Sequence, residues 1–254
     1  MAERVALVRR PSSRMADGIV TYGERVEADA ALAAEQHDAY VAALVAAGWA
    51  IREVPPADHL PDSAFVEDTV VVCGELAVLA RPGAPERRVE LAGTEEAVRR
   101  LGLEVARIEE PGTLDGGDVL QVGATLYVGR GGRTNSEGTR QLGALSGPRG
   151  LTVVAVPLKH VLHLKSAITA LPDGTIVVAD PSALDTSPLP QLVTVPEEAG
   201  SHVVPIGGEK ILMAASAPRS AELFAGRGFE PVVVDIGEFE KLEGCVTCLS
   251  VLIS

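Results

Sequence analysis

Residues 65–83 read FVEDTVVVCGELAVLARPG and contain two short apolar runs on either side of Cys73-Gly74-Glu75. Valine-rich runs separated by a glycine turn predict two adjacent strands. The segment GTEEAVRRLG at 93–102 has the spacing of a short amphipathic helix, and LEVARIEEP at 103–111 predicts a further strand. The predicted order is therefore strand, strand, helix, strand.

The same order recurs along the rest of the chain. Four more copies are predicted at 113–158, 161–198, 201–237 and, joined from the two chain ends, 246–254 with 4–56. The copy at 161–198 has the loose connection PSALDTSPLP in place of a helix. A repeat of this length indicates a propeller or a solenoid, and a ring closed by its own termini leaves no open sheet edge. We therefore predict an α/β fold in which residues 1–254 form a single domain of five ββαβ modules with pseudo-fivefold symmetry. An ordinary open α/β sheet is the alternative.

The composition narrows the class of protein. With 254 residues, 46% of them hydrophobic, the chain can form a core without disulfides or metals. Its three cysteines are sparse and odd in number, which favours free thiols and a cytoplasmic location. We find no apolar leader and no apolar run near the ~20 residues of a membrane span. The net charge of −13 disfavours nucleic acid and anionic membranes as partners and suits a small cationic substrate.

A polar position recurs when the first strands of the modules are aligned. It is occupied by Glu67, Asp115, His163 and Cys248, of which the first three are spaced 48 residues apart. Equivalent positions of a propeller face one central channel, so we predict that these side chains converge there. Taken singly, an Asp before Gly-Gly is typical of a turn and a His among apolar residues is typical of a core. Their common register favours a shared functional site.

The C-terminal motif CVTC permits three interpretations: a redox couple, half of a metal site, or one nucleophile with a bystander. The apolar run LSVLI that follows predicts a strand, and side chains three apart on a strand point to opposite faces. A redox pair normally opens a helix, and a structural zinc site needs further Cys or His pairs. We therefore predict that Cys248 is functional, that Cys245 is a small filler residue and that Cys73 is a buried thiol.

At these residues the sequence resembles the guanidine-modifying pentein superfamily, and within it the dimethylarginine dimethylaminohydrolases (dimethylargininases). The likeness is carried by five segments: LPDSAFVED, ARPGAPERR, TLDGGDVL with RTN eighteen residues beyond its Asp, VLHLKS and TCLS. The resemblance implies a five-bladed α/β propeller. It also implies hydrolysis of asymmetric dimethylarginine or monomethylarginine to citrulline and dimethylamine or methylamine. No metal or organic cofactor is implied, and a homodimer is compatible with the family.

The resemblance implies a role for each matching residue. Cys248 would attack the guanidinium carbon to give an S-alkylthiouronium, and His163 would act as acid and base. Asp115 would orient His163 and hold one guanidinium nitrogen. The substrate-binding residues would be Ile19, Asp62, Glu67, Asp68, Arg87, Arg133 and Leu242. Among them the carboxylates would hold the guanidinium, the arginines the substrate carboxylate, and the two apolar residues' carbonyls its ammonium.

Arginine deiminases resemble the chain too, but they carry His-x-Asp where this sequence has His163-Leu164-Lys165. The absent carboxylate leaves room for N-methyl groups, since a buried carboxylate facing methyls would cost on the order of 1 to 3 kcal/mol. Two residues near the proposed nucleophile depart from the family pattern: Glu243 stands where the family often has Asp, and Cys245 carries a thiol. Arginine or another substituted guanidine therefore remains an alternative substrate. A catalytically silent pentein binding module would have no reason to keep the complete polar register. A Cys-His acyl hydrolase would need an oxyanion hole and an apolar acyl pocket.

Overall fold

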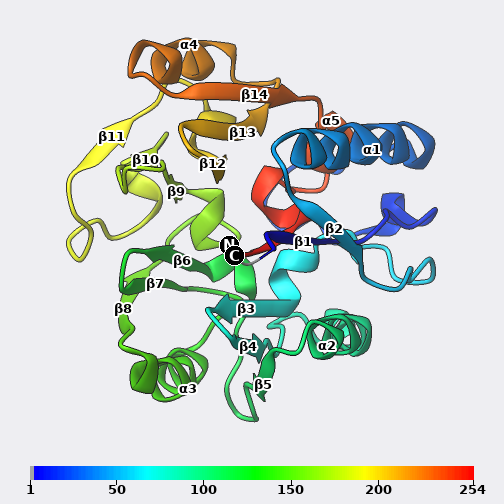
Figure 1. Cartoon of the computed structure of the whole chain (residues 1–254), viewed down its shortest axis with the longest axis vertical. Coiled ribbons are helices and arrows are strands. Elements are labelled where there is room, and N and C mark those ends of the chain that lie inside the picture. The colour runs from blue at the N-terminus through cyan, green and yellow to red at the C-terminus, as the bar shows by residue number, and fades with distance from the viewer. Residues whose placement is uncertain (1–2) are drawn as a thin grey trace.

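The computed structural model describes residues 3–254, which form five three-stranded sheets arranged around a common centre (Figure 1). In chain order the sheets are β15 (Val251–Ile253), β1 (Val5–Val8) and β2 (Ala50–Glu53); β3 (Val70–Cys73), β4 (Leu76–Leu79) and β5 (Glu104–Arg107); β6 (Val119–Val122), β7 (Thr125–Arg130) and β8 (Thr152–Pro157); β9 (Ile168–Ala170), β10 (Ile176–Val178) and β11 (Leu192–Thr194); β12 (Val203–Gly207), β13 (Lys210–Ala214) and β14 (Glu230–Val234). In every sheet the central strand pairs antiparallel with the first strand and parallel with the third. The predicted five-module repeat is confirmed.

Helices connect the second and third strands of four sheets and lie on the outer rim (Figure 1). They are α1 (Ala30–Ala46), α2 (Leu91–Arg100), α3 (Ser136–Ser146) and α4 (Pro218–Gly226), with a short α5 (Gly237–Glu240) after the last β-α-β unit. The module of β9, β10 and β11 has a loop with a single 3-10 turn at Pro181–Ala183 instead, as the loose sequence there predicts. Within residues 3–254, no helix has both the length and the apolar character that crossing a membrane requires.

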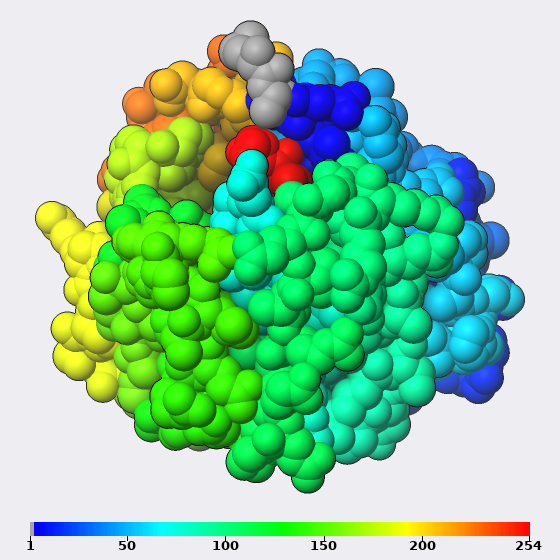
Figure 2. Space-filling view, turned by 60° about the horizontal axis from the view of Figure 1, so that its bottom comes forward, coloured from blue at the N-terminus to red at the C-terminus, as the bar shows by residue number. Residues whose placement is uncertain are grey.

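The two chain ends share one sheet. Val5 pairs with Ile253 and Leu7 pairs with Val251, so the last strand of the chain begins the module that the first strand continues. Figure 2 shows the C-terminal residues in red directly beside the N-terminal strand in blue. This pairing closes the ring, as the sequence repeat predicts.

The helices pack apolar side chains between neighbouring modules. Tyr40 and Leu44 of α1 pack into a buried cluster with Ile206 and Leu212 of the β12–β14 module. Leu142 of α3 packs into a cluster that the β3–β5 and β6–β8 modules share. These shared clusters join adjacent modules of the ring.

The predicted polar residues lie in, or directly before, turns that precede the first strands, and not within the strands. Each first strand is preceded by a 3-10 turn: η2 (Val66–Thr69), η4 (Gly116–Asp118), η6 (Leu164–Ser166), η8 (Glu198–Ser201) and η9 (Val246–Leu249). Turn η2 contacts η4 and η9, and η4 contacts η6. These contacts bring residues from four modules together near the centre of the ring.

Candidate active site

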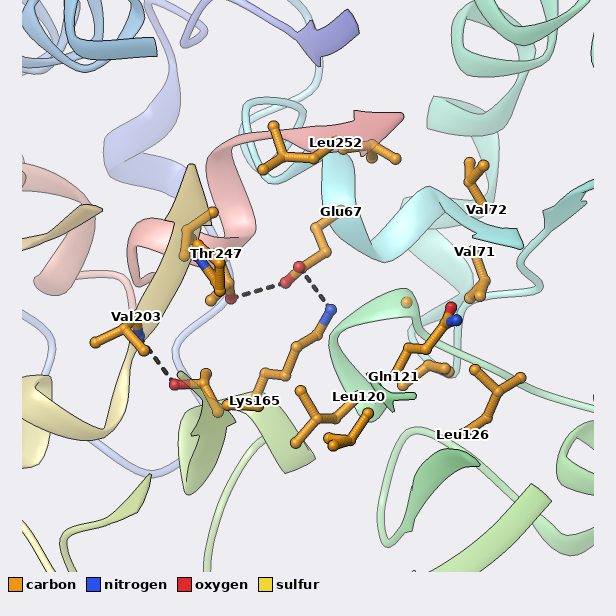
Figure 3. Close-up of a pocket in the computed structure, with 18 of the residues that line it drawn as sticks. Glu67, Val71, Val72, Leu120, Gln121, Leu126, Lys165, Val203, Thr247 and Leu252 are labelled. Atoms are coloured by element: carbon orange, nitrogen blue, oxygen red, sulfur yellow. Dashed lines mark hydrogen bonds and ion pairs between the residues drawn. The ribbon is translucent and has the colours of Figure 1, made fainter. Parts of the chain in front are cut away.

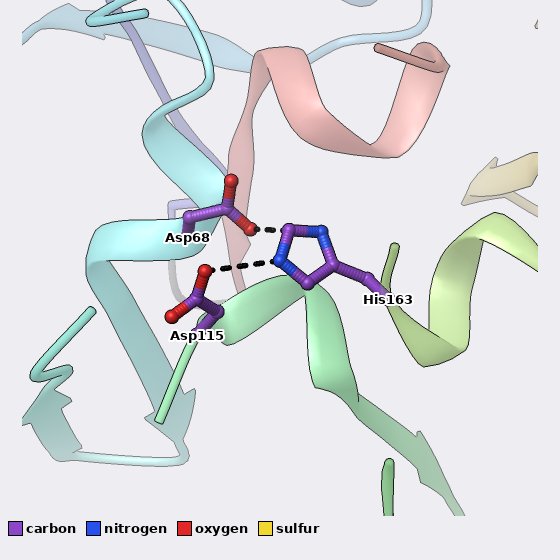
Figure 4. Close-up of side chains that lie close together, drawn as sticks. All are labelled: Asp68, Asp115 and His163. Carbon is purple, nitrogen blue, oxygen red and sulfur yellow. Dashed lines mark hydrogen bonds and ion pairs between the residues drawn. The ribbon is translucent and has the colours of Figure 1, made fainter. Parts of the chain in front are cut away.

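Each ring nitrogen of His163 faces a buried carboxylate (Figure 4). Its Nε2 is 3.0 Å from Oδ2 of Asp115, and its Nδ1 is 3.7 Å from Oδ1 of Asp68. His163 directly precedes η6, Asp115 directly precedes η4, and Asp68 belongs to η2. The packing of these three turns therefore builds the cluster. Its ligand-type atoms lie within 4.8 Å of one another, close enough to share a cation. Both carboxylates also accept a backbone hydrogen bond: the amide of Gly83 donates to Asp115, and the amide of Gly117 donates to Asp68.

The glycine pair of TLDGGD is required by this close packing. A β-carbon at Gly116 would lie 1.9 Å from the carbonyl oxygen of Glu67. A β-carbon at Gly117 would lie 2.6 Å from Oδ1 of Asp68 and 2.8 Å from Nδ1 of His163. A larger residue at either position would push η2 or the imidazole away, so glycine here serves close approach.

The two acids keep His163 protonated. Burial alone would lower the pKa of His163, because a charged imidazole loses its hydration. The negative charge of Asp68 and the hydrogen bond to Asp115 outweigh this effect and raise the pKa to about 9. Burial would likewise raise the pKa of Asp68, but the charges of His163 and Arg87 lower it to about 2. At neutral pH the imidazole is therefore a cation with a proton to donate.

Asp118 fixes the turns that carry His163 and Asp115, a role that we did not predict from the sequence. The buried carboxylate accepts the amide of Leu164 at 2.9 Å and the hydroxyl of Thr134 at 2.5 Å. The same hydroxyl accepts the amide of Asp115 at 3.1 Å. Asp118 thus ties η6 to η4 and fixes the positions of His163 and Asp115. The second acid of the motif DGGD is the signal that could have indicated it.

A small pocket brings together eight of the ten predicted site residues. It is lined by Cys248 and His163 and by the predicted substrate-binding residues Ile19, Asp62, Asp68, Arg87, Arg133 and Leu242. Asp115 lies behind the imidazole and does not line the pocket. Phe65, Leu162, Glu243 and Gly244 complete the lining.

Glu67 does not line this pocket. Its carboxylate accepts hydrogen bonds from Nζ of Lys165 at 2.6 Å and from Oγ1 of Thr247 at 2.8 Å, in a separate central cavity of about 440 Å³ (Figure 3). Asp68, the next residue, faces His163 instead. Successive side chains of a 3-10 turn point about 120° apart, so alignment by strand selected the neighbour of the residue that enters the pocket.

The two arginines predicted to bind the substrate carboxylate, Arg87 and Arg133, differ in how many hydrogen bonds they make within the protein. Arg87 is 4% exposed and donates to Asp68 at 2.5 Å, to Glu90 at 2.8 Å and to the carbonyls of Asp62 and Phe65. Burial would lower the pKa of Arg87, but Glu90 and Asp68 raise it well above its ordinary value. Most of its N–H groups thus already have acceptors within the protein.

Arg133 has fewer acceptors around it. Its Nη2 donates to Oγ1 of Thr21 at 3.2 Å, and its Nη1 is 3.8 Å from Oδ2 of Asp115. Its guanidinium is therefore better placed than that of Arg87 to bind an anionic group that enters the pocket.

The loop of residues 19–23 borders the pocket, and two acids hold it there. The amide of Ile19 donates to Asp62 at 3.1 Å, and the carboxylate of Glu243 accepts the amides of Thr21, Tyr22 and Gly23 at 2.7, 2.6 and 2.7 Å. Glu243 adopts a φ of 60°, which is uncommon for a residue other than glycine. Of this loop, Ile19 lines the pocket, and Tyr22 and Gly23 line a neighbouring cavity. The free space in the pocket is about 20 Å³, close to what one water molecule needs, so an amino acid enters only if lining residues move.

The predicted arrangement of the C-terminal cysteines is wrong. Cys245 directly precedes η9 and Cys248 lies within it, and their Sγ atoms are 3.3 Å apart. The predicted strand begins only at Val251, and residues three apart on a 3-10 turn lie on the same side. Donation from the Cys248 thiol lowers the pKa of Cys245 well below its ordinary value, and the same shared proton raises that of Cys248.

Comparison with known proteins gives a consistent result. No protein-family model matches the chain. It is 62% identical over 251 residues to the N(G),N(G)-dimethylarginine dimethylaminohydrolase of Streptomyces coelicolor, covering 99% of this chain and 97% of that one. It is 37% identical to the protein of the same name from Pseudomonas aeruginosa, covering 96% and 97%. A cysteine-to-serine mutant of the Pseudomonas aeruginosa protein, complexed with citrulline, superposes with a TM-score of 0.92 at 34% identity over the whole of both chains.

Proposed function

The chain belongs to the dimethylarginine dimethylaminohydrolase family of the pentein superfamily, and we propose that Cys248 and His163 perform its hydrolysis of dimethylarginine to citrulline. The observation that carries this assignment is the shared pocket, in which a thiol and a cationic imidazole lie among acidic side chains. Monomethylarginine is proposed as a second substrate, because it presents the same guanidinium with one methyl group fewer.

The pocket suits both ends of an arginine derivative. A guanidinium is a planar cation with several N–H donors, and Asp62 and Asp68 supply carboxylates to the pocket wall. Arg133 supplies the planar donors that a substrate carboxylate requires. The backbone carbonyls of Ile19 and Leu242 are the proposed acceptors of the substrate ammonium.

The first half of the reaction transfers the amidine carbon to sulfur. The hydrogen bond to Cys245 raises the pKa of Cys248, and the guanidinium cation of a bound substrate next to the sulfur lowers it, so that the proton leaves to solvent. The thiolate then attacks the guanidinium carbon, and an S–C bond forms. His163 donates its proton to the departing dimethylamine as the C–N bond breaks, which leaves an S-alkylthiouronium on Cys248. Nε2 of His163 is engaged by Asp115, whereas the 3.7 Å from Nδ1 to Asp68 is too long for a hydrogen bond. The Nδ1 proton is therefore the one available for transfer.

The second half regenerates the enzyme. Neutral His163 removes a proton from water, the resulting hydroxide adds to the same carbon, and the C–S bond breaks to release citrulline. Asp115 keeps the ring in one orientation through both steps and stabilises its positive charge. The supporting observation is the raised pKa of His163, about 9, which suits an acid that must be charged before each turnover.

The position of Lys165 supports methylated substrates. Lys165 stands where the deiminases carry a second acid, and its ammonium pairs with Glu67 in the central cavity instead of entering the pocket. Leu162 and Leu242 line the pocket, so apolar surface is available for methyl groups. A methylated nitrogen lacks the donors that a second carboxylate would require.

The fold and its thiols support two further parts of the proposal. Cys73, Cys245 and Cys248 are free thiols, which supports a reducing, cytoplasmic setting. The closure of the sheet ring by both chain ends supports a single catalytic domain.

The direct test is incubation with asymmetric dimethylarginine, monomethylarginine and arginine, each followed by measurement of citrulline. We expect the methylated substrates to give a higher kcat/KM than arginine, and Cys248→Ser to give no citrulline. Cys73→Ser is the matched control, because Cys73 lies in the buried cluster of another module. A preference for arginine would refute the substrate assignment.

A further inference from the structure

We propose that Cys245 and Cys248 are a reversible redox pair, which a hydroperoxide oxidises to an intramolecular disulfide that switches the hydrolase off. Formation of the disulfide follows from the arrangement of the two sulfurs alone. Only the loss of activity rests on the proposed role of Cys248 as nucleophile.

The two sulfurs are already in contact. Their 3.3 Å separation must shorten by only about 1.2 Å to reach an S–S bond of about 2.05 Å. Both side chains leave the same side of one 3-10 turn, with Cys245 at its first boundary and Cys248 inside it. A Cys-x-x-Cys motif at the start of a helical turn is the arrangement that dithiol oxidoreductases use.

The two cysteines differ in their access to the active-site pocket, so we expect them to react in a fixed order. Cys248 lines the active-site pocket, so a small solute that enters the pocket meets this sulfur first. Cys245 lies behind it, is 3% exposed and contacts Oγ1 of Thr247 at 3.2 Å. Cys73 belongs to a different apolar cluster and is not in position to compete for either sulfur.

The oxidation balances with a hydroperoxide as the oxidant. The Cys248 thiol gives up its proton and its sulfur attacks one peroxide oxygen, so that an S–O bond forms, the O–O bond breaks and the leaving hydroxide takes up that proton to become water. The thiolate of Cys245 then attacks the sulfenic sulfur, an S–S bond forms, the S–O bond breaks, and the leaving hydroxide takes a proton from solvent to become a second water. The sulfur pair loses two electrons and hydrogen peroxide is reduced to two water molecules. An external dithiol reverses the change by thiol–disulfide exchange.

This second thiol has a protective consequence. A sulfenic acid that meets no second thiol is oxidised further to the sulfinic acid, which dithiols do not reduce. Cys245, whose sulfur lies 3.3 Å from that of Cys248, is in position to attack the sulfenic sulfur first. The pair therefore turns an irreversible loss of the nucleophile into a recoverable one.

The test uses the purified full chain and hydrogen peroxide, followed by dithiothreitol. Lys241 precedes the tryptic peptide Leu242–Ser254, which contains both cysteines and no further Lys or Arg. We expect this peptide to lose the mass of two hydrogens and the citrulline-forming activity to fall to a small fraction of its initial value. Dithiothreitol should reverse both changes. A peptide that gains oxygen without losing two hydrogens would overturn the proposal, whatever the substrate of the enzyme proves to be.

Two variants complete the test. Cys245→Ser keeps the proposed nucleophile, so we expect it to hydrolyse methylarginine and to be inactivated by peroxide without recovery in dithiothreitol. Cys73→Ser is expected to respond as the unsubstituted protein does. Full recovery of Cys245→Ser would contradict the proposal. If Cys245→Ser does not fold, the peptide mass of the unsubstituted protein decides alone.

Discussion

Nε2 of His163 lies 3.0 Å from Oδ2 of Asp115, although 48 residues separate them in the chain. Each residue directly precedes the 3-10 turn that opens the first strand of its own module. The contact is therefore a product of the repeat: equivalent positions of neighbouring modules meet at the centre of the ring. The proposed acid–base chemistry depends on this one relationship, since Asp115 both orients the imidazole and helps to charge it.

The carboxylates of Asp68 and Asp115 beside His163 should set the alkaline limit of activity. The acid step needs protonated His163, so activity is present below its pKa of about 9 and is lost as the pH rises through that value. In Asp115→Asn the imidazole loses a negative neighbour, and its pKa falls. We expect the alkaline limb of the kcat/KM profile to move to lower pH. An unchanged limb in this variant would show that another group controls it.

Gly117 should tolerate no side chain. In Gly117→Ala the new β-carbon must displace Asp68 or His163, and a misplacement near 1 Å costs on the order of 100-fold in rate. The matched control is Gly132→Ala, because a β-carbon at Gly132 would meet no atom within 4 Å. Measuring kcat/KM for both variants decides the point, and equal losses would contradict it.

Asp68 and Glu67 are neighbours in sequence with different expected roles. Asp68→Asn removes a carboxylate from the active-site pocket, and we expect kcat/KM for methylarginine to fall steeply. Glu67→Gln changes a carboxylate that binds Lys165 and Thr247 in the central cavity, so we expect a smaller effect on kcat/KM. Kinetics of both variants, with thermal unfolding to report stability, separate the two roles. A larger loss for Glu67→Gln would restore it as the substrate ligand.

Glu243 should hold the loop closed. In Glu243→Gln one carboxylate oxygen becomes a donor, so the amides of residues 21–23 lose part of a charge-assisted set of hydrogen bonds. We expect a higher KM and faster tryptic cleavage after Arg25, which lies just beyond the loop. Glu240→Gln is the control, because Glu240 accepts from Ser216 and none of its hydrogen bonds reaches the loop. Equal cleavage rates would show that Glu243 does not restrain the loop.

The fold was predictable because its signals are local. The turn at Gly74 between β3 and β4 and the apolar spacing of α2 are each encoded within about ten residues. Repetition of these signals then fixed the architecture, including the closure of the ring by β15 and β1.

The sequence was sufficient to predict most residues of the site, but not the direction in which each side chain points. The sequence placed a carboxylate near 67 at the centre but could not distinguish Glu67 from Asp68, because side-chain direction depends on the exact course of η2. The contact of Cys245 with Cys248 was missed for the same reason, since a turn stands where a strand was expected. The hydrogen bonds between Glu243 and the loop at 21–23 join residues about 220 positions apart, and no local sequence pattern predicts such a contact.

The covalent intermediate on Cys248 is the most direct test of the proposed chemistry. The enzyme is mixed with asymmetric dimethylarginine, quenched in acid during turnover and digested with trypsin, and the peptide Leu242–Ser254 is analysed by tandem mass spectrometry. We predict an adduct with the mass of substrate minus dimethylamine on Cys248, present in Cys245→Ser and absent in Cys248→Ser. An adduct on Cys245, or citrulline formation by Cys248→Ser, would contradict the assignment of the nucleophile.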